Sequence, residues 1–177
     1  ISYQMINAYQ LYIIQDYLGL STKESGATVT VMSSITLVVG LVGGFLGGPL
    51  SDILKRRKVP VVMASLLFAL GVLMPWIMPT TTGIYLFALI AGFGYAVYSS
   101  VDQALNVDVL PNPDNAGKDL GVFNIANALP QSLAPYIAPF FLAIGSVNKT
   151  NYPALCYMAG VCAIIGGLLV IPIKKVK

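Results

Sequence analysis

Long apolar blocks alternate with short polar links along the whole chain. A membrane-spanning helix needs about 20 largely apolar residues, and six blocks approach or meet that length. The predicted spans cover residues 1–18, 28–50, 60–78, 84–108, 120–144 and 152–173. Because the apolar residues form blocks and do not alternate with polar ones, strands are not predicted. The pattern predicts an all-α membrane protein with six transmembrane helices.

Composition agrees with a membrane protein. Of the residues, 56% are hydrophobic and 10% are charged, whereas a soluble domain carries about 25% charged residues. A soluble globule of this size could not bury so many apolar blocks, because small globules keep much of their surface exposed. The chain begins at Ile1 inside an apolar-aromatic run with no basic n-region or cleavage site. We therefore expect a fragment cut near a helix start, and not a signal peptide.

Lysine and arginine are distributed unevenly over the links. When the links are assigned alternately to two sides, one side receives Lys55, Arg56, Arg57, Lys58, Lys118, Lys174, Lys175 and Lys177, and the other receives Lys23 and Lys149. Basic residues are retained in the cytoplasm during insertion, so the first group marks the inside. Both ends are predicted to be cytoplasmic, in the plasma (inner) membrane. The positive charge is thus assigned to topology, and no nucleic-acid partner is expected.

The most defined motif follows the second predicted span, where residues 48–58 read GPLSDILKRRK. Asp52 lies at the C-terminal end of that helix, where the helix dipole repels a negative charge. We expect a compensating partner for Asp52, either among the basic residues that follow or at the N-terminus of a neighbouring helix. The alternative interpretation is an ordinary basic loop on the cytoplasmic side.

This stretch resembles the cytoplasmic-loop motif of the major facilitator superfamily, G-x-L-x-D-R-x-G-R-[RK]. The matching residues are Gly48, Leu50, Asp52, Arg56 and Arg57, while Ile53 and Lys55 replace the Arg and Gly of the family. The motif follows the second helix of each six-helix half and is more degenerate in the second. The resemblance implies two inverted three-helix repeats forming a C-terminal half, with the missing N-terminal six-helix half as partner. It also implies that Asp52, Arg56 and Arg57 form a conformational latch.

A second resemblance covers the fourth and fifth predicted spans. The segments that carry it are Asp102-Gln103-Ala104-Leu105, Leu110-Pro111, residues 117–121 (GKDLG), Asn124 and Pro130-Gln131. They are similar to sugar-transporting facilitators, namely glycoside–pentoside–hexuronide symporters and plant-type sucrose carriers. The resemblance implies a sugar or glycoside as the solute, with proton or sodium coupling.

Polar side chains share one face of the first and fourth spans, which the resemblance places beside the central cavity. Polar groups are costly against lipid, so such faces point to the protein interior or to a water-filled path. Amides, hydroxyls and aromatic rings suit a neutral polyol. Polar contacts between helices are the alternative. The predicted substrate-binding residues are Tyr3, Gln4, Asn7, Gln10, Tyr95, Tyr98, Ser99 and Asn127.

Other polar and small residues have more than one interpretation. Asp102, in the fourth span, is a candidate for ion coupling, and a salt bridge to Lys118 or to the missing half is the alternative. Asn127 belongs to the fifth span, whose prolines predict a bend that serves as a gate or as static shape. The glycine repeats at 40, 44 and 48 and at 43 and 47 predict helix packing, without direct substrate contact.

No catalytic, metal or cofactor site is predicted. The chain has no histidine, and its two cysteines are six residues apart on different helix faces. The sequence therefore favours secondary active transport of a small solute by alternating access, with the lipid bilayer as its environment. A facilitator for drugs or organic ions, a membrane enzyme and a channel or scaffold subunit are the alternatives, although an enzyme lacks a recognisable catalytic constellation.

Overall fold

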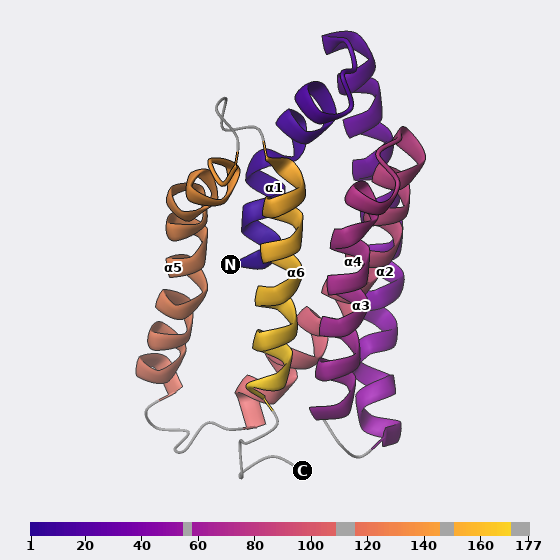
Figure 1. Ribbon diagram of the computed structural model, residues 1–177. Helices are drawn as coiled ribbons and strands as arrows, with labels where there is room; N and C mark the ends of the chain where they lie inside the picture. Colours follow the sequence, from indigo (N-terminus) through magenta and orange to yellow (C-terminus); the bar gives the residue numbers. More distant parts are fainter. Residues whose placement is uncertain (55–57, 109–115, 146–150, 171–177) are drawn as a thin grey trace.

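The computed structural model describes residues 1–54, 58–108, 116–145 and 151–170, apart from side chains at 50–52, 54, 104–108, 116, 119–120 and 123. All regular secondary structure in these ranges is helical (Figure 1). The elements are α1 Ser2–Tyr12, the π-helix η1 Ile13–Tyr17, α2 Thr22–Leu54, α3 Lys58–Ile77, α4 Thr81–Asp108, α5 Ala116–Leu142 and α6 Tyr152–Leu168. Each predicted span overlaps one of these helical segments, α1 and η1 together forming the first.

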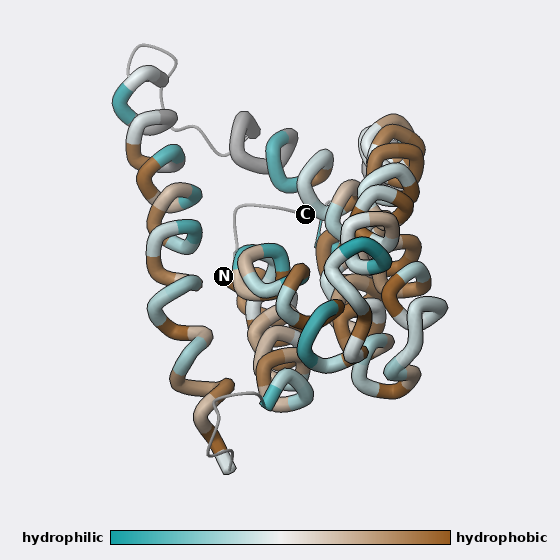
Figure 2. Tube along the Cα trace, turned by 90° about the horizontal axis from the view of Figure 1, so that it is seen from above, coloured by the Kyte–Doolittle hydropathy of each residue, from teal (hydrophilic) through white to brown (hydrophobic). Residues whose placement is uncertain are grey.

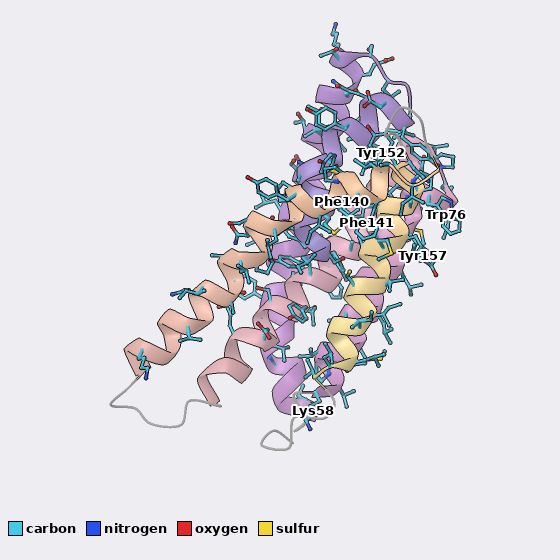
Figure 3. All side chains as sticks on the ribbon, turned by 60° about the vertical axis from the view of Figure 1, so that its left-hand side comes forward. Lys58, Trp76, Phe140, Phe141, Tyr152 and Tyr157 are labelled. Atoms are coloured by element: carbon cyan, nitrogen blue, oxygen red, sulfur yellow. The ribbon has the colours of Figure 1, made fainter. Side chains whose placement is uncertain are left out.

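Within the ranges that the structure describes, three helices are long and apolar enough to cross a membrane. These stretches are Thr22–Pro49, Lys58–Ile77 and Thr81–Gln103, and the shorter helix Tyr152–Leu168 is also apolar. The all-helical membrane character is therefore confirmed, while the six-span arrangement stays a prediction. Figure 3 shows Lys58 at the opposite end of the bundle from Trp76, whose side chain is 48% exposed, as is typical of aromatic residues at a membrane interface.

The start of α2 differs from the prediction. The helix begins at Thr22 and not at residue 28, because Ser21 and Glu24 form a capping box. The Ser21 hydroxyl and backbone N–H donate to Glu24 Oε2 over 2.6 and 3.1 Å, and the Glu24 N–H donates to Ser21 Oγ over 3.4 Å. This reciprocal arrangement satisfies backbone N–H groups that the first helical turn leaves without partners.

The first predicted span contains a change of helix type. After Tyr12 the chain continues as the π-helix, and Gly19 then turns it with φ +66°. Within the π-helix, Asp16 accepts a 2.7 Å hydrogen bond from the hydroxyl of Tyr152, which is buried at the start of α6. Tyr17 packs against the same ring, with centroids 6.2 Å apart. These contacts fix the C-terminal end of the first predicted span to the start of α6.

Close helix packing depends on a few glycines. In α4, Gly94 lies so near α3 that a Cβ would come within 2.8 Å of the Phe68 backbone nitrogen, and Gly71 of α3 packs against Ala91 of α4. In α2, Gly43 and Gly47 contact α4, whereas a Cβ at Gly40, Gly44 or Gly48 would meet nothing within 4 Å. Only one of the two glycine repeats of α2 therefore packs within the described part of the chain.

The more extensive contacts among the α-helices form a repeating scheme. The helix α4 packs on α2 and α3, α1 packs on α5 and α6, α3 packs on α6, and smaller contacts join α2 to α3 and α5 to α6. In consequence α5 lies on the far side of α1 and α6 from the group of α2, α3 and α4 (Figures 1 and 2). Exchanging α1, α2 and α3 with α4, α5 and α6 reproduces the same set of contacts.

Candidate functional site

One cavity of about 320 Å³ lies between α1, α2 and α4; we call it the α1–α2 cavity. The small residues Ala88, Ala91 and Gly92 form its α4 side and leave the space open. The helix α1 buries Met5 and Ile6 in the core, while Asn7 and Gln10 of the same helix line the cavity. The polar and aromatic lining residues are Tyr3, Asn7, Gln10, Ser33, Thr36, Phe68 and Phe87.

The polar groups of this cavity are available to a ligand. Within the described part of the chain, the side chains of Asn7, Gln10 and Ser33 make no hydrogen bond. Thr36 differs, because its hydroxyl donates to the Met32 carbonyl over 2.9 Å. Each amide offers two N–H donors and a carbonyl acceptor. The cavity lining has no charged residue, so its chemistry is that of neutral hydrogen bonding beside aromatic rings.

A second cavity of about 440 Å³ lies between α1, α3, α4 and α6; we call it the α3–α6 cavity. Tyr95, Tyr98 and Cys162 line it together with several aliphatic residues. Two of its hydroxyls already have partners, since Ser2 donates to the Ala159 carbonyl over 2.5 Å and Ser65 donates to the Val61 carbonyl over 2.8 Å. Its other polar side-chain groups are tyrosine hydroxyls and the Cys162 thiol, so, unlike the α1–α2 cavity, it presents no side-chain amide.

Three aromatic rings stand where the two cavities meet; we call them the aromatic wall. Tyr3 and Tyr95 stack with centroids 3.9 Å apart and planes at 6°. Phe68 is tilted against both rings, at 6.3 Å from Tyr3 and 6.2 Å from Tyr95. Tyr3 and Phe68 line both cavities. The wall thus joins side chains from α1, α3 and α4 and separates the two spaces.

The predicted substrate-binding residues do not all meet at one cavity. Tyr3, Asn7 and Gln10 line the α1–α2 cavity, whereas Tyr95 and Tyr98 line the α3–α6 cavity, so the expected single cavity is divided. The remaining three residues line neither space: Gln4 is half-buried, Ser99 accepts a 3.4 Å hydrogen bond from Gln103, and Asn127 is exposed on α5. The roles of all these residues stay predictions.

The predicted coupling and gating residues are only partly described. Asp102 is half-buried in α4 and Lys118 is exposed near the start of α5. Asp52 lies in the last turn of α2, but its side chain, like Arg56 and Arg57, lies outside the described residues. The proposed latch therefore stays a prediction. Among the described residues, no group of three or more His, Cys, Asp or Glu side chains could hold a metal ion.

Sequence reasoning missed the contribution of α2 and α3 to the cavities. Ser33 and Thr36 are three residues apart on α2 and line the α1–α2 cavity, although the glycine repeats of this helix were expected to serve packing without direct substrate contact. The same spacing argument that selected Asn7 and Gln10 would have found them. Phe68 carried no such signal, because a phenylalanine in an apolar helix is usually a core residue.

Comparison with known proteins identifies similar transporters. The probable galactarate/D-glucarate transporter GudP of Escherichia coli (strain K12) is 29% identical over 189 residues, which is 100% of this chain and 39% of that protein. The protein of the same name from Bacillus subtilis (strain 168) is 28% identical over 188 residues, 99% of this chain and 39% of the relative. The Pseudomonas putida protein of that name is 26% identical over 160 residues, which is 86% of this chain and 33% of that protein.

The chain thus spans between 33% and 39% of the length of these relatives. No solved structure gives a significant match. A family model described as Major Facilitator Superfamily matches residues 1–177, the whole chain. The sequence motif at 48–58, the apolar helices and this match agree: the chain belongs to the major facilitator superfamily.

Proposed function

We propose that this chain is the C-terminal six-helix half of a secondary transporter that moves a small polyhydroxylated solute by alternating access. The observation that carries the proposal is the α1–α2 cavity, where Asn7, Gln10 and Ser33 present side chains without hydrogen-bond partners among the described residues. A polar side chain that faces lipid raises the free energy of the folded protein. In a membrane protein such groups therefore border a water-filled path or a ligand.

The chemistry of the cavity favours hydroxyl groups as its ligands. Each hydroxyl can donate and accept, and amides such as those of Asn7 and Gln10 can do the same. The rings of Tyr3 and Phe87 add flat apolar surface, which suits the carbon face of a sugar or polyol. An uncharged lining gives a drug or organic ion no fixed counter-charge, which makes that alternative less favourable.

A sugar acid is the second candidate, because the three similar proteins are named as probable galactarate/D-glucarate transporters. The hydroxylated middle of such a solute fits the same amides. Its two carboxylates are bound most strongly by cationic partners, and the lining of the α1–α2 cavity supplies no cation. Under this version, groups elsewhere in the transporter bind the carboxylates.

The inverted-repeat arrangement is also part of the proposal. The helix-helix contacts support this arrangement, because the same pairs of helices are in contact when the first three helices are exchanged with the last three. Two repeats of related structure are expected to pack in such equivalent ways. Proton or sodium coupling through Asp102, Lys118 and the latch at Asp52, Arg56 and Arg57 completes the mechanism. Both ends of the chain lie on the cytoplasmic side in this arrangement.

Uptake into proteoliposomes tests the proposal with the intact protein that contains this chain. The panel comprises radiolabelled galactitol as the neutral solute and galactarate as the acid, each with and without a proton or sodium gradient. We expect saturable, gradient-dependent uptake of galactitol, and competition by unlabelled hexitols. Uptake of galactarate alone would favour the second candidate. Absence of uptake of both solutes, or a non-saturating conductance typical of a channel, would refute the proposal.

A further inference from the structure

The aromatic wall has a consequence for which solutes the transporter accepts. We infer that Phe68 is a specificity-determining residue of the proposed solute site. Its ring closes the α1–α2 cavity on the side of the α3–α6 cavity and limits the length of the bound solute. The inference rests on the proposed function, because it assigns a role within the same solute site. Phe68 belongs to α3, which no sequence signal connected with the solute.

The position of the ring supports this role. Phe68 lines both cavities although it is only 6% exposed, so it borders each space while most of its surface is covered by the neighbouring helices. The α1–α2 cavity, at about 320 Å³, lies near the lower end of the 300–1,000 Å³ range of ligand pockets. It therefore suits a solute of monosaccharide length, and the space for a second sugar unit lies behind Phe68.

The wall is anchored on its α3 and α4 sides. Next to Tyr95, Gly94 packs on the backbone of Phe68 and on the Ala64 carbonyl, where a Cβ would come within 2.8 and 2.9 Å. This contact between backbones does not involve the phenyl ring. Removing the ring should leave the two helices in place and join the cavities, instead of letting them collapse.

The space behind the wall suits the extension of a solute. Tyr95 and Tyr98 provide two further rings and Ile165 provides aliphatic surface, so a second sugar unit would find a stacking surface. Cys162 also lines this space and is half-buried, whereas Cys156 is buried and does not line it. The thiol of Cys162 is therefore a natural reporter for a solute that extends past Phe68.

The test measures affinity and thiol protection in the intact protein that contains this chain. The probes are galactitol and galactarate as short solutes, and lactitol and lactobionate as their disaccharide-length counterparts. The wild-type protein should bind its short solute at least tenfold more tightly than the long one, and Phe68→Ala should reduce that preference by about tenfold or more, the range seen when a pocket changes size. Bound long solute should slow the labelling of Cys162 by a methanethiosulfonate reagent in Phe68→Ala only.

Two further variants make the result decisive. Leu70→Ala removes a side chain of α3 that is 55% exposed and lines neither cavity, so it should change neither readout. Phe68→Leu keeps an apolar side chain, and it replaces Phe68→Ala in both readouts if the alanine variant does not fold. A folded Phe68 variant that binds the short solute but still rejects the long one, without protection of Cys162, would overturn the inference. A wild-type protein that binds neither short solute would instead refute the proposed function.

Discussion

Two adjacent glycines of α2 offer a matched test of how this helix packs. Adding a methyl group at Gly43 would place a Cβ 2.8 Å from the Cβ of Ala96 and 3.2 Å from the carbonyl oxygen of Phe93. Both contacts are with α4, and the second is with backbone, which cannot rotate away. The same methyl group at Gly44 would meet nothing within 4 Å.

The expected magnitudes follow from two opposing effects. Replacing a helical glycine by alanine stabilises the helix by roughly 0.5–1 kcal/mol at either position. At Gly43, overpacking against Ala96 costs typically about 1–3 kcal/mol. Gly44→Ala should therefore be neutral or stabilising, and Gly43→Ala should be less stable than Gly44→Ala by about 1–3 kcal/mol. For a chain of this size, each kcal/mol shifts Tm by about 2–4 °C.

Thermal unfolding of the two variants in detergent micelles measures this difference, with the wild-type chain as reference. The helix propensity gain is common to both variants, so the difference in Tm between them isolates the steric effect at Gly43. Equal Tm values would refute the packing of α2 against α4 through Gly43, and a lower Tm for Gly44→Ala would mean that the open face of α2 is occupied within the chain.

Three further variants test contacts elsewhere. Tyr152→Phe removes the hydrogen bond to the exposed Asp16 and should lower the free energy of unfolding by about 1 kcal/mol; an unchanged Tm would show that this contact does not hold the first span. Ser21→Ala should speed hydrogen exchange in the first turn of α2, because Glu24 loses its capping partner; exchange as slow as in the wild type would contradict the capping box. Asp52→Asn in the intact protein should impair uptake without loss of expression, and unchanged uptake would reduce residues 48–58 to a basic loop.

The helices were predictable because apolar blocks of spanning length have few alternatives in a chain with so few charges. The boundaries were less predictable where local chemistry extends a helix beyond its apolar block. At α2 the capping residues Ser21 and Glu24 moved the start to Thr22. The contact of Asp16 with Tyr152 joins residues 136 positions apart, which no periodicity within one span reveals.

The candidate site was predictable on α1 and much less so elsewhere. Asn7 and Gln10 were found because their spacing places both amides on one face of a helix that is otherwise largely apolar. Ser33 was not predicted, because the most regular pattern in α2 is its glycine spacing, which indicates helix packing. The division into two cavities could not be predicted, because it results from rings on three different helices, and only tertiary packing brings Tyr3 against Phe68.

Titration calorimetry of the α1–α2 cavity tests most directly whether this space is the solute site. Galactitol should bind the intact wild-type protein that contains this chain, and Asn7→Ala should weaken binding by about 1–3 kcal/mol, because a hydroxyl of the bound solute loses its partner. Ser34→Ala is the control, since the Ser34 hydroxyl donates to the Thr30 carbonyl of its own helix over 2.9 Å and should leave the affinity unchanged. Equal affinities of the wild-type and Asn7→Ala proteins would contradict the assignment of the solute site to this cavity.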